Sequence, residues 1–328
     1  MIFSVAPMMD WTDRHCRSFH RVLSATALLY TEMVTADAVR FGPRDRLIGW
    51  SPQDEGAVAL QLGGSDPAAL AEASRIGADF GYGEINLNVG CPSDRVQSGR
   101  FGACLMREPQ LVADCLAAMI AAVPKDVAVT VKHRLGVDEQ DPEQSLSAFV
   151  ETVAASGVTT FIVHARKAWL KGLSPKENRD VPPLDYGIVH RLKAARPELS
   201  VHLNGGLVSP EAGMEAAAGL DGIMLGRAAY HEPACLGRVD RVVSGLAVAD
   251  VEPVEALARF RPYVARALER GVPLVAISRH MLGLAHGRPR ARAFRRLLSD
   301  GARVPGAGLE IYDQAAALLA PPDMAQAA

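Results

Sequence analysis

The stretch Val127-Ala128-Val129-Thr130-Val131-Lys132 is an almost unbroken apolar run that ends in a cation. Strands that are buried on both faces, as in parallel sheets covered by helices, have this composition. The run Thr160-Phe161-Ile162-Val163-His164 has the same arrangement and ends in a histidine. The two stretches predict a parallel α/β fold whose strands end in side chains able to bond a ligand.

Segments of this kind alternate with helical patterns along most of the chain. The expected strands are Ile2–Ala6, Leu28–Glu32, Val58–Gln61, Glu84–Asn88, Val127–Lys132, Thr160–His164, Ser200–Leu203 and Gly222–Leu225. The clearest helices between them are Pro67–Ile76, Pro109–Ala122, Pro142–Ala155, Tyr186–Ala195 and Pro210–Ala218. Eight strand–helix units predict a (β/α)₈ barrel, the TIM-barrel architecture. The alternative, a doubly wound open sheet, requires a glycine fingerprint after the first strand, and Ala6-Pro7-Met8-Met9-Asp10 does not provide one.

The barrel pattern ends near Gly245, and from about Val254 the sequence is helical throughout. We therefore expect a barrel domain over residues 1–245 and a smaller all-helical domain over residues 246–328. Length is compatible with this division, because one barrel fills about 250 residues.

Basic residues are concentrated in the expected helical domain. Between Arg259 and Arg303 there are eleven arginines, and the only acids are Glu269 and Asp300. This excess is too one-sided for simple ion pairing along a helix, so it predicts a surface that binds a polyanion. The alternative is an ordinary solvated helix face.

The overall composition fits a soluble enzyme. Hydrophobic residues make up 49% of the chain, and the net charge of -2 excludes a uniformly basic coat. Five cysteines without a regular framework indicate a reducing cytoplasm, and no apolar run approaches the roughly 20 residues that span a bilayer. We expect a cytoplasmic protein without a metal that acts as a monomer, although the sequence leaves the oligomeric state open.

The residues at the carboxyl ends of the expected strands form the next signal, because barrel active sites are built there. They are Met8, Glu32, Gln61, Asn88, Lys132, His164, Asn204 and Gly226. Most of these side chains can form hydrogen bonds or carry charge, although the segments before them are apolar. A purely structural role does not explain so many polar residues at strand ends, so we expect an active site at this end of the barrel.

The last two strands run into Asn204-Gly205-Gly206 and Gly226-Arg227. Glycines there let backbone N–H groups approach an anion, although they also serve tight turns. These loops are the usual phosphate site of barrels. With a cation at Lys132 and amides at Gln61 and Asn88, the set suits flavin mononucleotide (FMN). Gln61 is placed to bond the edge of the flavin ring, and Lys132 to stabilise negative charge at N1–C2=O of the reduced flavin.

Cys91 lies three residues beyond the expected end of the fourth strand, between Gly90 and Pro92. A free cysteine is usually a small buried hydrophobe, but its place on an active-face loop makes Cys91 a candidate for chemistry. Cys104, Cys115 and Cys235 keep the structural interpretation, and too few ligands surround Cys16 for a metal site.

Two long connections interrupt the barrel pattern, namely Gly90–Met106 and Arg166–Pro183. Loops at this end of a barrel carry function. The second connection is rich in lysine and arginine, which predicts a lid or a contact with a polyanion.

With these motifs the sequence resembles the dihydrouridine synthase family, over most of the chain and in the family's order. The matching segments are Ala6–Asp13, Glu84–Pro92, Gly102–Met106, Val131–Gly136, Val163–Arg166, Asn204–Gly206 and Leu225–Arg227. The segments Arg166–Tyr186 and His280–Leu284 are similar to the branch that acts on uridines 20 and 20a of the tRNA D-loop. The core motifs show no departure from the family's pattern, and the helical part is less diagnostic than the barrel.

The resemblance implies a cofactor, a reductant and a substrate. FMN is expected on Pro7, Met8, Met9, Gln61, Lys132, His164, Asn204, Gly205, Gly206, Gly226 and Arg227, with NADPH as the reductant. Contacts with tRNA are expected at Asn88, Lys176, Arg179, Arg292 and Arg295, and Arg134 is a further candidate for contact with the base.

The expected reaction is hydride transfer from flavin N5 to uracil C6, with a proton delivered to C5 from the opposite face. An unperturbed thiol has a pKa of about 8.5, so Cys91 is expected to be protonated at neutral pH and to serve as the acid. The target base must leave the tRNA stack to reach the flavin. Two alternatives remain, an FMN-dependent dehydrogenase of a free pyrimidine such as dihydroorotate and a non-catalytic RNA-binding barrel.

Overall fold

The computed structural model describes residues 1–320 and contains a closed ring of eight parallel strands. The ring consists of β1 (Ile2–Val5), β2 (Leu28–Tyr30), β4 (Val58–Gly63), β5 (Glu84–Val89), β6 (Ala128–Arg134), β7 (Thr160–His164), β8 (Ser200–Asn204) and β9 (Gly222–Leu225). Each strand pairs with the next, and β1 closes the ring against β9. The predicted TIM barrel is confirmed, and the expected strand ends differ from the observed ones by at most two residues.

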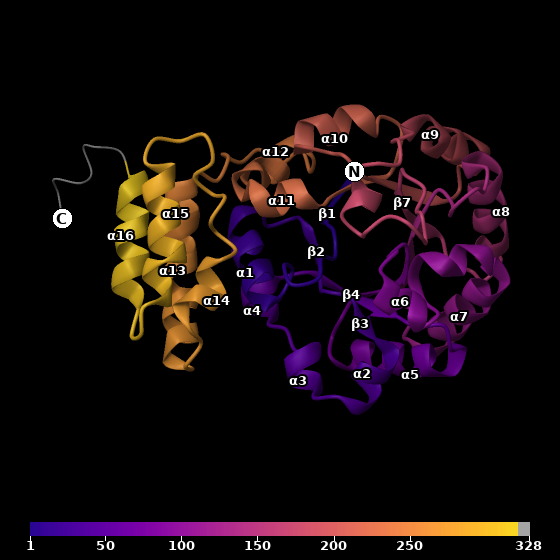
Figure 1. Cartoon of the computed structure of the whole chain (residues 1–328), viewed down its shortest axis with the longest axis horizontal. Coiled ribbons are helices and arrows are strands. Elements are labelled where there is room, and N and C mark those ends of the chain that lie inside the picture. The colour runs from indigo at the N-terminus through magenta and orange to yellow at the C-terminus, as the bar shows by residue number, and fades with distance from the viewer. Residues whose placement is uncertain (321–328) are drawn as a thin grey trace.

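Helices cover the outside of the ring (Figure 1). They include α1 (Arg14–Leu23), α5 (Pro67–Asp79), α7 (Pro109–Ala122), α8 (Pro142–Ala154), α9 (Tyr186–Ala195), α10 (Pro210–Ala216) and α11 (Arg227–His231). Three helices start with a first-turn proline and a capping side chain. Asp66, Asp141 and Ser209 each accept the backbone N–H of the residue three positions later. The sequence signals for these helices therefore correspond to real caps.

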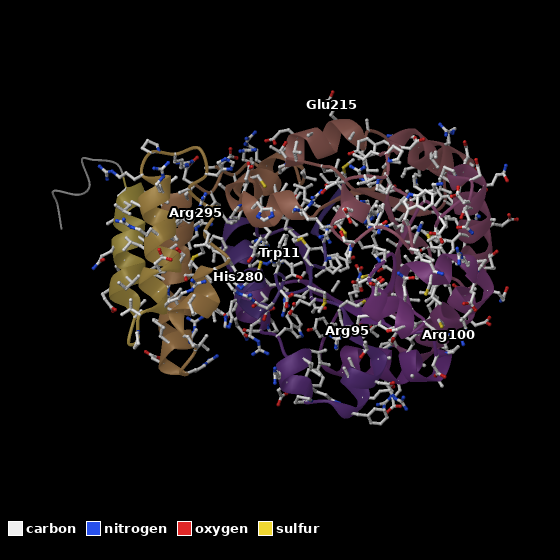
Figure 2. All side chains as sticks on the ribbon, viewed as in Figure 1. Trp11, Arg95, Arg100, Glu215, His280 and Arg295 are labelled. Atoms are coloured by element: carbon white, nitrogen blue, oxygen red, sulfur yellow. The ribbon has the colours of Figure 1, made fainter. Side chains whose placement is uncertain are left out.

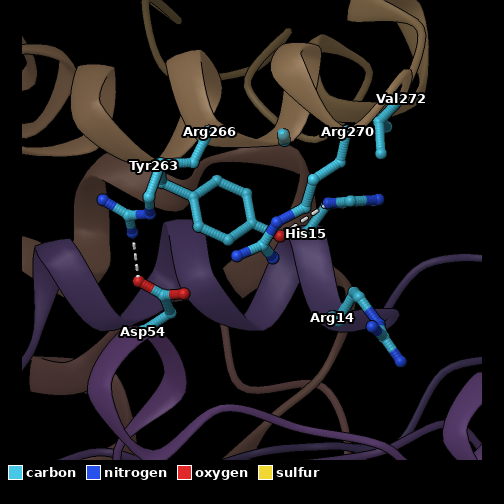
Figure 3. Close-up of a pocket in the computed structure, with 8 residues that line it drawn as sticks. Arg14, His15, Asp54, Tyr263, Arg266, Arg270 and Val272 are labelled. Carbon is cyan, nitrogen blue, oxygen red and sulfur yellow. Dashed lines mark hydrogen bonds and ion pairs between the residues drawn. The ribbon is translucent and has the colours of Figure 1, made fainter.

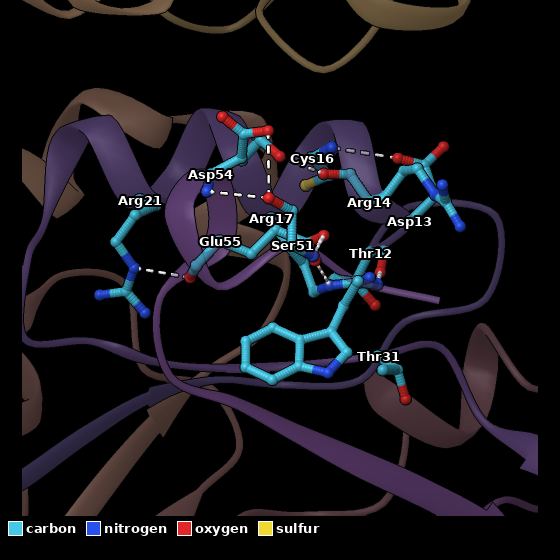
Figure 4. Close-up of polar contacts among 12 residues, drawn as sticks. Thr12, Asp13, Arg14, Cys16, Arg17, Arg21, Thr31, Ser51, Asp54 and Glu55 are labelled. Atoms are coloured by element: carbon cyan, nitrogen blue, oxygen red, sulfur yellow. Dashed lines mark hydrogen bonds and ion pairs between the residues drawn. The ribbon is translucent and has the colours of Figure 1, made fainter. Parts of the chain in front are cut away.

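The connection from β2 to β4 was not anticipated. It holds the two-residue strand β3 (Val34–Thr35), which pairs only with β4, and the short helices α2 (Ala36–Phe41), α3 (Arg44–Leu47) and α4 (Pro52–Glu55). Glu55 of α4 forms a buried ion pair with Arg17 of α1 at 2.6 Å, and Arg17 also donates to the Thr12 carbonyl at 2.7 Å (Figure 4). These bonds anchor the loop that follows β1.

Shorter elements lie in the two long connections that the sequence singled out. The connection after β5 contains α6 (Asp94–Ser98) and the 3₁₀ turn η1 (Gly102–Arg107), and the connection after β7 contains η2 (Glu177–Arg179). Both follow carboxyl ends of strands, so they lie at the end of the barrel where active sites form.

After β9 every element that the structure describes is helical. The chain continues through η3 (Pro233–Arg238), α12 (Val239–Val242), α13 (Pro253–Glu269), α14 (Leu274–Ser278), α15 (Ala291–Ser299), η4 (Gly301–Arg303) and α16 (Leu309–Leu319). The last helices stand side by side at one end of the molecule, and α13 packs on α1 of the barrel (Figure 1). The predicted all-helical C-terminal part is thus present. Within residues 1–320 no helix is long and apolar enough to cross a membrane.

Candidate active site

The polar strand-end residues come together at the carboxyl end of the barrel. Lys132 Nζ donates to Asn204 Oδ1 at 3.0 Å, and Asn88 Nδ2 donates to Gln61 Oε1 at 2.8 Å. His164 lies beside Asn204 in the β7–β8 ladder. Asn88 lies opposite Lys132 in the β5–β6 ladder. The five predicted site residues therefore belong to one connected group, although Gln61, Asn88 and Lys132 precede the last residues of their strands.

Lys132 is a cation in an unusual environment. Its Nζ bonds the neutral Asn204 amide, and across residues 1–320 no carboxylate lies within ion-pair distance of it. Burial, together with the charge of nearby Arg134, lowers the pKa of Lys132 to about 7. A cation held without a counter-charge fits an anionic or electron-rich ligand, which is the requirement of a reduced flavin.

His164 lies near the same positive charges as Lys132. Burial lowers the pKa of His164 well below its ordinary value, and the charges of Arg134 and Lys132 lower it further. His164 is therefore neutral and serves as a hydrogen-bonding group. The positive charge of this group of side chains supports binding of a phosphate or of a reduced flavin ring.

Arg134 ties two loops together. Its Nε donates to the Gly90 carbonyl at 3.0 Å, and its Nη1 donates to the carbonyls of Lys167 and Asn178 at 3.1 and 2.8 Å. The side chain is only 3% exposed, and burial lowers its pKa to about 10. Because its guanidinium is buried and bonded to backbone carbonyls, Arg134 is better placed to hold the two active-face loops in position than to contact a base directly.

The Cys91 loop is held by Asn88. Asn88 Oδ1 accepts the N–H groups of Gly90 and Cys91 at 3.1 and 3.0 Å. The loop then folds back so that Ala103 N donates to the Cys91 carbonyl at 2.9 Å. A side chain at Gly102 would lie 2.6 Å from that carbonyl, and the backbone there has φ +77°. Only glycine fits this close turn.

The Cys91 thiol is half-buried and donates to Ser93 Oγ at 3.6 Å. No histidine or carboxylate in the described part of the chain hydrogen-bonds it. Three of the remaining cysteines are buried: burial raises the pKa of Cys115 and Cys235 to about 12, and raises that of Cys16 well above its ordinary value. Cys104 is half-buried, its thiol donates to the Phe101 carbonyl at 3.2 Å, and burial raises its pKa. Cys91 and Cys104 are both half-buried, and Cys91 is the one whose backbone is bonded directly to the strand-end residue Asn88.

The predicted phosphate loops follow β8 and β9. Gly205 and Gly206 have φ of +110° and +69°, and a side chain at Gly205 would lie 2.6 Å from the His164 ring. Tyr186 OH donates to the Gly205 carbonyl at 2.6 Å. At Gly226 an added Cβ would meet no protein atom closer than 3.8 Å, so packing inside the protein does not require a glycine there and the space suits a ligand.

The loop after β1 lies next to Gly226. The nearest atoms to a Cβ at Gly226 belong to Ala6 and Met8. Pro7 and Met8 are half-buried and Met9 is exposed. Met8 N donates to Thr12 Oγ1 at 3.0 Å, which fixes the turn. The β1 and β9 loops therefore border the same region, as a shared cofactor site requires.

The segment Arg166–Pro183 is folded around Asn178. Asn178 is buried, and its amide bonds backbone groups of Trp169 and Leu173 at 2.7 to 3.1 Å. Asp180 pairs with Arg227 at 2.8 Å, so the cation predicted to hold a phosphate has a carboxylate partner in this structure. Within the same segment the side chains of Lys176 and Arg179 are exposed.

The arginines of the helical part divide into two groups. Five of the eleven pair with carboxylates outside the basic stretch: Arg259, Arg261, Arg266, Arg279 and Arg288. Pairing along one helix accounts for one of the five, Arg259 with Glu255 four residues earlier in α13, while the other four arginines pair with carboxylates elsewhere in the sequence. Arg292 and Arg295 are exposed on α15 and have no carboxylate partner within the described chain. Figure 2 labels Arg295 on this helix.

Two contacts between the barrel and the helical part were missed by sequence reasoning. Asp13 accepts from Arg279 at 2.6 Å and contacts His280 at 3.1 Å, and these bonds with the helical residues hold its pKa well below its ordinary value despite burial. Trp11 stacks on Tyr230 of α11 within the barrel, with ring centroids 4.4 Å apart, and the Tyr230 ring contacts the His280 ring of the helical part edge-on at 5.8 Å. Figure 2 places Trp11 and His280 where the two parts meet. The helical part is therefore attached to the loop that follows β1.

A small hollow lies between α1 and α13, apart from the strand-end group (Figure 3). Tyr263 OH and His15 Nδ1 are 2.6 Å apart within it, and Arg266 pairs with Asp54 at 2.5 Å. Arg270 lines the hollow and has no carboxylate partner in residues 1–320. Its charge extends the basic surface of the helical part toward the barrel.

The described residues contain no group of three or more histidine, cysteine, aspartate or glutamate side chains that could hold a metal ion. The donor set at the strand ends, with amides, a lysine and glycine-rich loops, is instead that of an organic anion.

Comparison with known proteins places this chemistry in a family. The profile described as Dihydrouridine synthase (Dus) matches residues 4–319. The chain is similar to an old yellow enzyme homologue of known structure from Zymomonas mobilis, with 12% identity, a TM-score of 0.49, and coverage of 76% of this chain and 90% of that one.

Close relatives share most of their length with this chain. The tRNA-dihydrouridine(20/20a) synthase of Xanthomonas campestris pv. campestris is 56% identical, with 95% of this chain and 92% of that one covered. Its counterpart from Escherichia coli O6:H1 is 52% identical, with 97% and 95% covered. The resemblance predicted from the motifs is confirmed, and the chain belongs to the dihydrouridine synthase family.

Proposed function

We propose that this protein reduces the C5–C6 double bond of uridines in the tRNA D-loop to 5,6-dihydrouridine, at positions 20 and 20a, with FMN as cofactor. The observation that carries the proposal is the position of the Cys91 loop, which Asn88 and Arg134 tie to the end of the barrel that holds the uncompensated Lys132 cation. The names of the relatives support tRNA as the substrate.

The cofactor site combines a cation, amides and glycine-rich loops. The proposed FMN-binding residues are Pro7, Met8, Met9, Gln61, Lys132, His164, Asn204, Gly205, Gly206, Gly226 and Arg227. Bound FMN, after reduction by NADPH, supplies the hydride that adds to C6 of uracil. Lys132 stabilises negative charge on the reduced ring, and the space at Gly226 admits the phosphate. Release of Arg227 from Asp180 would free its guanidinium for that phosphate.

Cys91 completes the reduction by donating its thiol proton to C5. Negative charge that develops toward C5 and O4 is neutralised when the S–H bond breaks and the C5–H bond forms. Ser93 Oγ orients the thiol, and Asn88 has a second amide N–H for the uracil edge. Arg134 fixes the loop on which the acid stands.

Binding of tRNA uses cations outside the catalytic group. Lys176 and Arg179 on the loop after β7, and Arg292 and Arg295 on α15, are exposed and suited to phosphate contacts. We accordingly assign flavin chemistry to residues 1–245, and tRNA binding to residues 246–328 together with the barrel-loop cations Lys176 and Arg179. Residues 321–328 lie outside the described residues. The proposal takes the protein as a monomer acting in the cytoplasm, where tRNA is modified.

The direct test incubates the purified protein with FMN, NADPH and tRNA from cells that lack it, and then maps dihydrouridine in the product. Dihydrouridine at positions 20 and 20a supports the proposal, and NADH in place of NADPH measures the preference for the reductant. Dihydrouridine at another position would overturn the site assignment. Turnover of orotate without tRNA would indicate a dehydrogenase of free pyrimidines, and absence of any bound flavin would indicate a binding protein without catalysis.

A further inference from the structure

A chain of hydrogen bonds runs through the interior of the barrel from the thiol loop to Glu84. Its links are Cys91 N to Asn88 Oδ1 at 3.0 Å, Asn88 Nδ2 to Gln61 Oε1 at 2.8 Å, Gln61 Nε2 to Asn86 Oδ1 at 2.7 Å, Asn86 Nδ2 to Thr130 Oγ1 at 2.8 Å, and Thr130 Oγ1 to Glu84 Oε1 at 2.7 Å. Glu84 precedes Asn88 by four residues on β5, which places it about 13 Å deeper in the barrel at roughly 3.3 Å per residue.

Both ends of the chain fix its direction. At the thiol loop, backbone N–H groups of Gly90 and Cys91 only donate, so Asn88 must present its oxygen to them. At the other end an oxygen of Glu84 accepts two hydroxyl groups, from Thr130 and from Tyr30. Every side-chain amide between these ends donates toward Glu84. None can exchange the positions of its oxygen and nitrogen without breaking at least two hydrogen bonds.

The middle of the chain is isolated from solvent. Gln61, Asn86 and Thr130 are each 2% exposed or less, so water does not replace a bond that is lost. Aligned hydrogen bonds in a medium of low dielectric constant strengthen one another. The acceptor strength of Asn88 Oδ1, which holds the thiol loop, therefore depends on groups that lie below the active site.

We infer that Thr130 and Glu84 are positioning residues for the Cys91 loop, acting through Asn86, Gln61 and Asn88. This inference rests on the proposed function, because it assumes that the thiol is the acid. Burial raises the pKa of Glu84 above its ordinary value, and the hydrogen bonds from Thr130 and Tyr30 offset only part of this rise. The chain requires only an acceptor oxygen at Oε1, which both protonation states provide.

The structure offers a closely matched pair of substitutions. Thr130 and Tyr30 are both buried and both donate to the same oxygen of Glu84. Thr130 also accepts from Asn86 and so belongs to the chain, whereas Tyr30 does not. Thr130→Val keeps the shape and removes the link, Tyr30→Phe removes a comparable bond outside the chain, and Thr130→Ser restores the hydroxyl.

The measurements are the alkylation rate of Cys91 in the flavin-loaded protein, followed on its peptide by mass spectrometry, and kcat and KM for tRNA. Since a buried amide left without its acceptor loses the strength of about one hydrogen bond, we expect Thr130→Val to lower kcat about tenfold and to change the alkylation rate about threefold or more. KM for tRNA should stay within about twofold, as should all values for Tyr30→Phe and Thr130→Ser.

Equal effects of Thr130→Val and Tyr30→Phe, or wild-type behaviour of Thr130→Val, would overturn the inference. If Thr130→Val does not fold, Asn86→Leu interrupts the same chain with a side chain of similar shape and is judged by the same criteria. Failure of the proposed function has a different signature: the wild-type protein would not reduce tRNA at all, while the alkylation comparison would still test whether the chain controls the loop.

Discussion

Replacing Lys132 by methionine removes a half-buried cation that the described residues leave without a carboxylate partner. In the wild-type protein burial, with the charge of Arg134, lowers the pKa of Lys132 to about 7. The ammonium charge is therefore present below pH 7 and is lost as the pH rises above it. Since an anionic ligand favours the charged form, FMN binding above pH 7 must take up a proton.

The magnitude follows from this linkage. If Lys132 is charged in the complex, the dissociation constant of FMN should rise by up to about tenfold for each pH unit above 7. Because about half of the lysine is already neutral at pH 7, the rise between pH 7 and pH 9 should be about fiftyfold. Lys132→Met should bind FMN weakly and show no such slope. The unfolded chain keeps this lysine charged up to its ordinary pKa of 10.5, so the stability of the flavin-free protein should rise with pH across the same range.

The assay titrates FMN into flavin-free protein at pH 7, 8 and 9 and follows the quenching of flavin fluorescence. Lys125→Met is the matched control, because Lys125 is an exposed lysine just before the amino end of β6, at the opposite end of the barrel. It should leave the pH dependence unchanged. An equal slope in Lys132→Met and the wild-type protein, or no slope in the wild-type protein, would refute the assignment of this lysine to the flavin.

The other predictions concern tRNA binding, stability and the cofactor loop. Replacing Arg292 and Arg295 by glutamine should weaken tRNA binding and leave flavin reduction by NADPH unchanged. The slope of the logarithm of the tRNA association constant against log salt concentration should fall by about one per lost phosphate contact. Arg288→Gln removes an arginine that is already ion-paired, so it should reduce this slope less. Arg17→Met leaves a buried carboxylate unpaired and should lower the free energy of unfolding by about 3–5 kcal/mol in urea titrations; a loss below about 1 kcal/mol would indicate an insignificant pair. Gly205→Ala places a Cβ 2.6 Å from the His164 ring at a φ of +110°, so purified protein should retain less FMN, and full retention would contradict the proposed loop geometry.

The barrel was predictable because its strands are buried on both faces. Such strands have a composition that periodic helices and polar loops lack, so their number and order followed from the sequence. Their exact ends did not. Strand β6 continues through His133 and Arg134, because Arg134 pairs with His164 of β7 in the ladder, and backbone pairing does not depend on side-chain polarity.

The connection from β2 to β4 was not predictable from local patterns. A strand of two residues and helices of four to six residues are too short to show a hydrophobic period. These short elements are held by tertiary contacts. One is the ion pair between Arg17 and Glu55, which lie 38 positions apart in the sequence. The sequence contains both residues but carries no signal that joins them.

The same limit applies to the site. Asn88, Lys132 and Cys91 were identifiable because each follows or ends an apolar strand on the active face of a barrel. Their partners were not, since bonds such as Lys132 to Asn204 depend on how strands far apart in sequence are brought together. Ion pairing of the C-terminal arginines was underestimated for this reason, because the carboxylates lie outside the basic stretch.

The central claim is that Cys91 delivers a proton to a uracil that is reduced from its other face. The direct test reduces the flavin-loaded protein, mixes it with tRNA that lacks dihydrouridine, and follows flavin reoxidation in a single turnover without oxygen. Removing a general acid costs about 10²–10⁴-fold, so Cys91→Ala should reoxidise at least about a hundredfold more slowly than the wild-type protein, while its reduction by NADPH stays unchanged. Reoxidation of Cys91→Ala by tRNA at the wild-type rate would contradict the account.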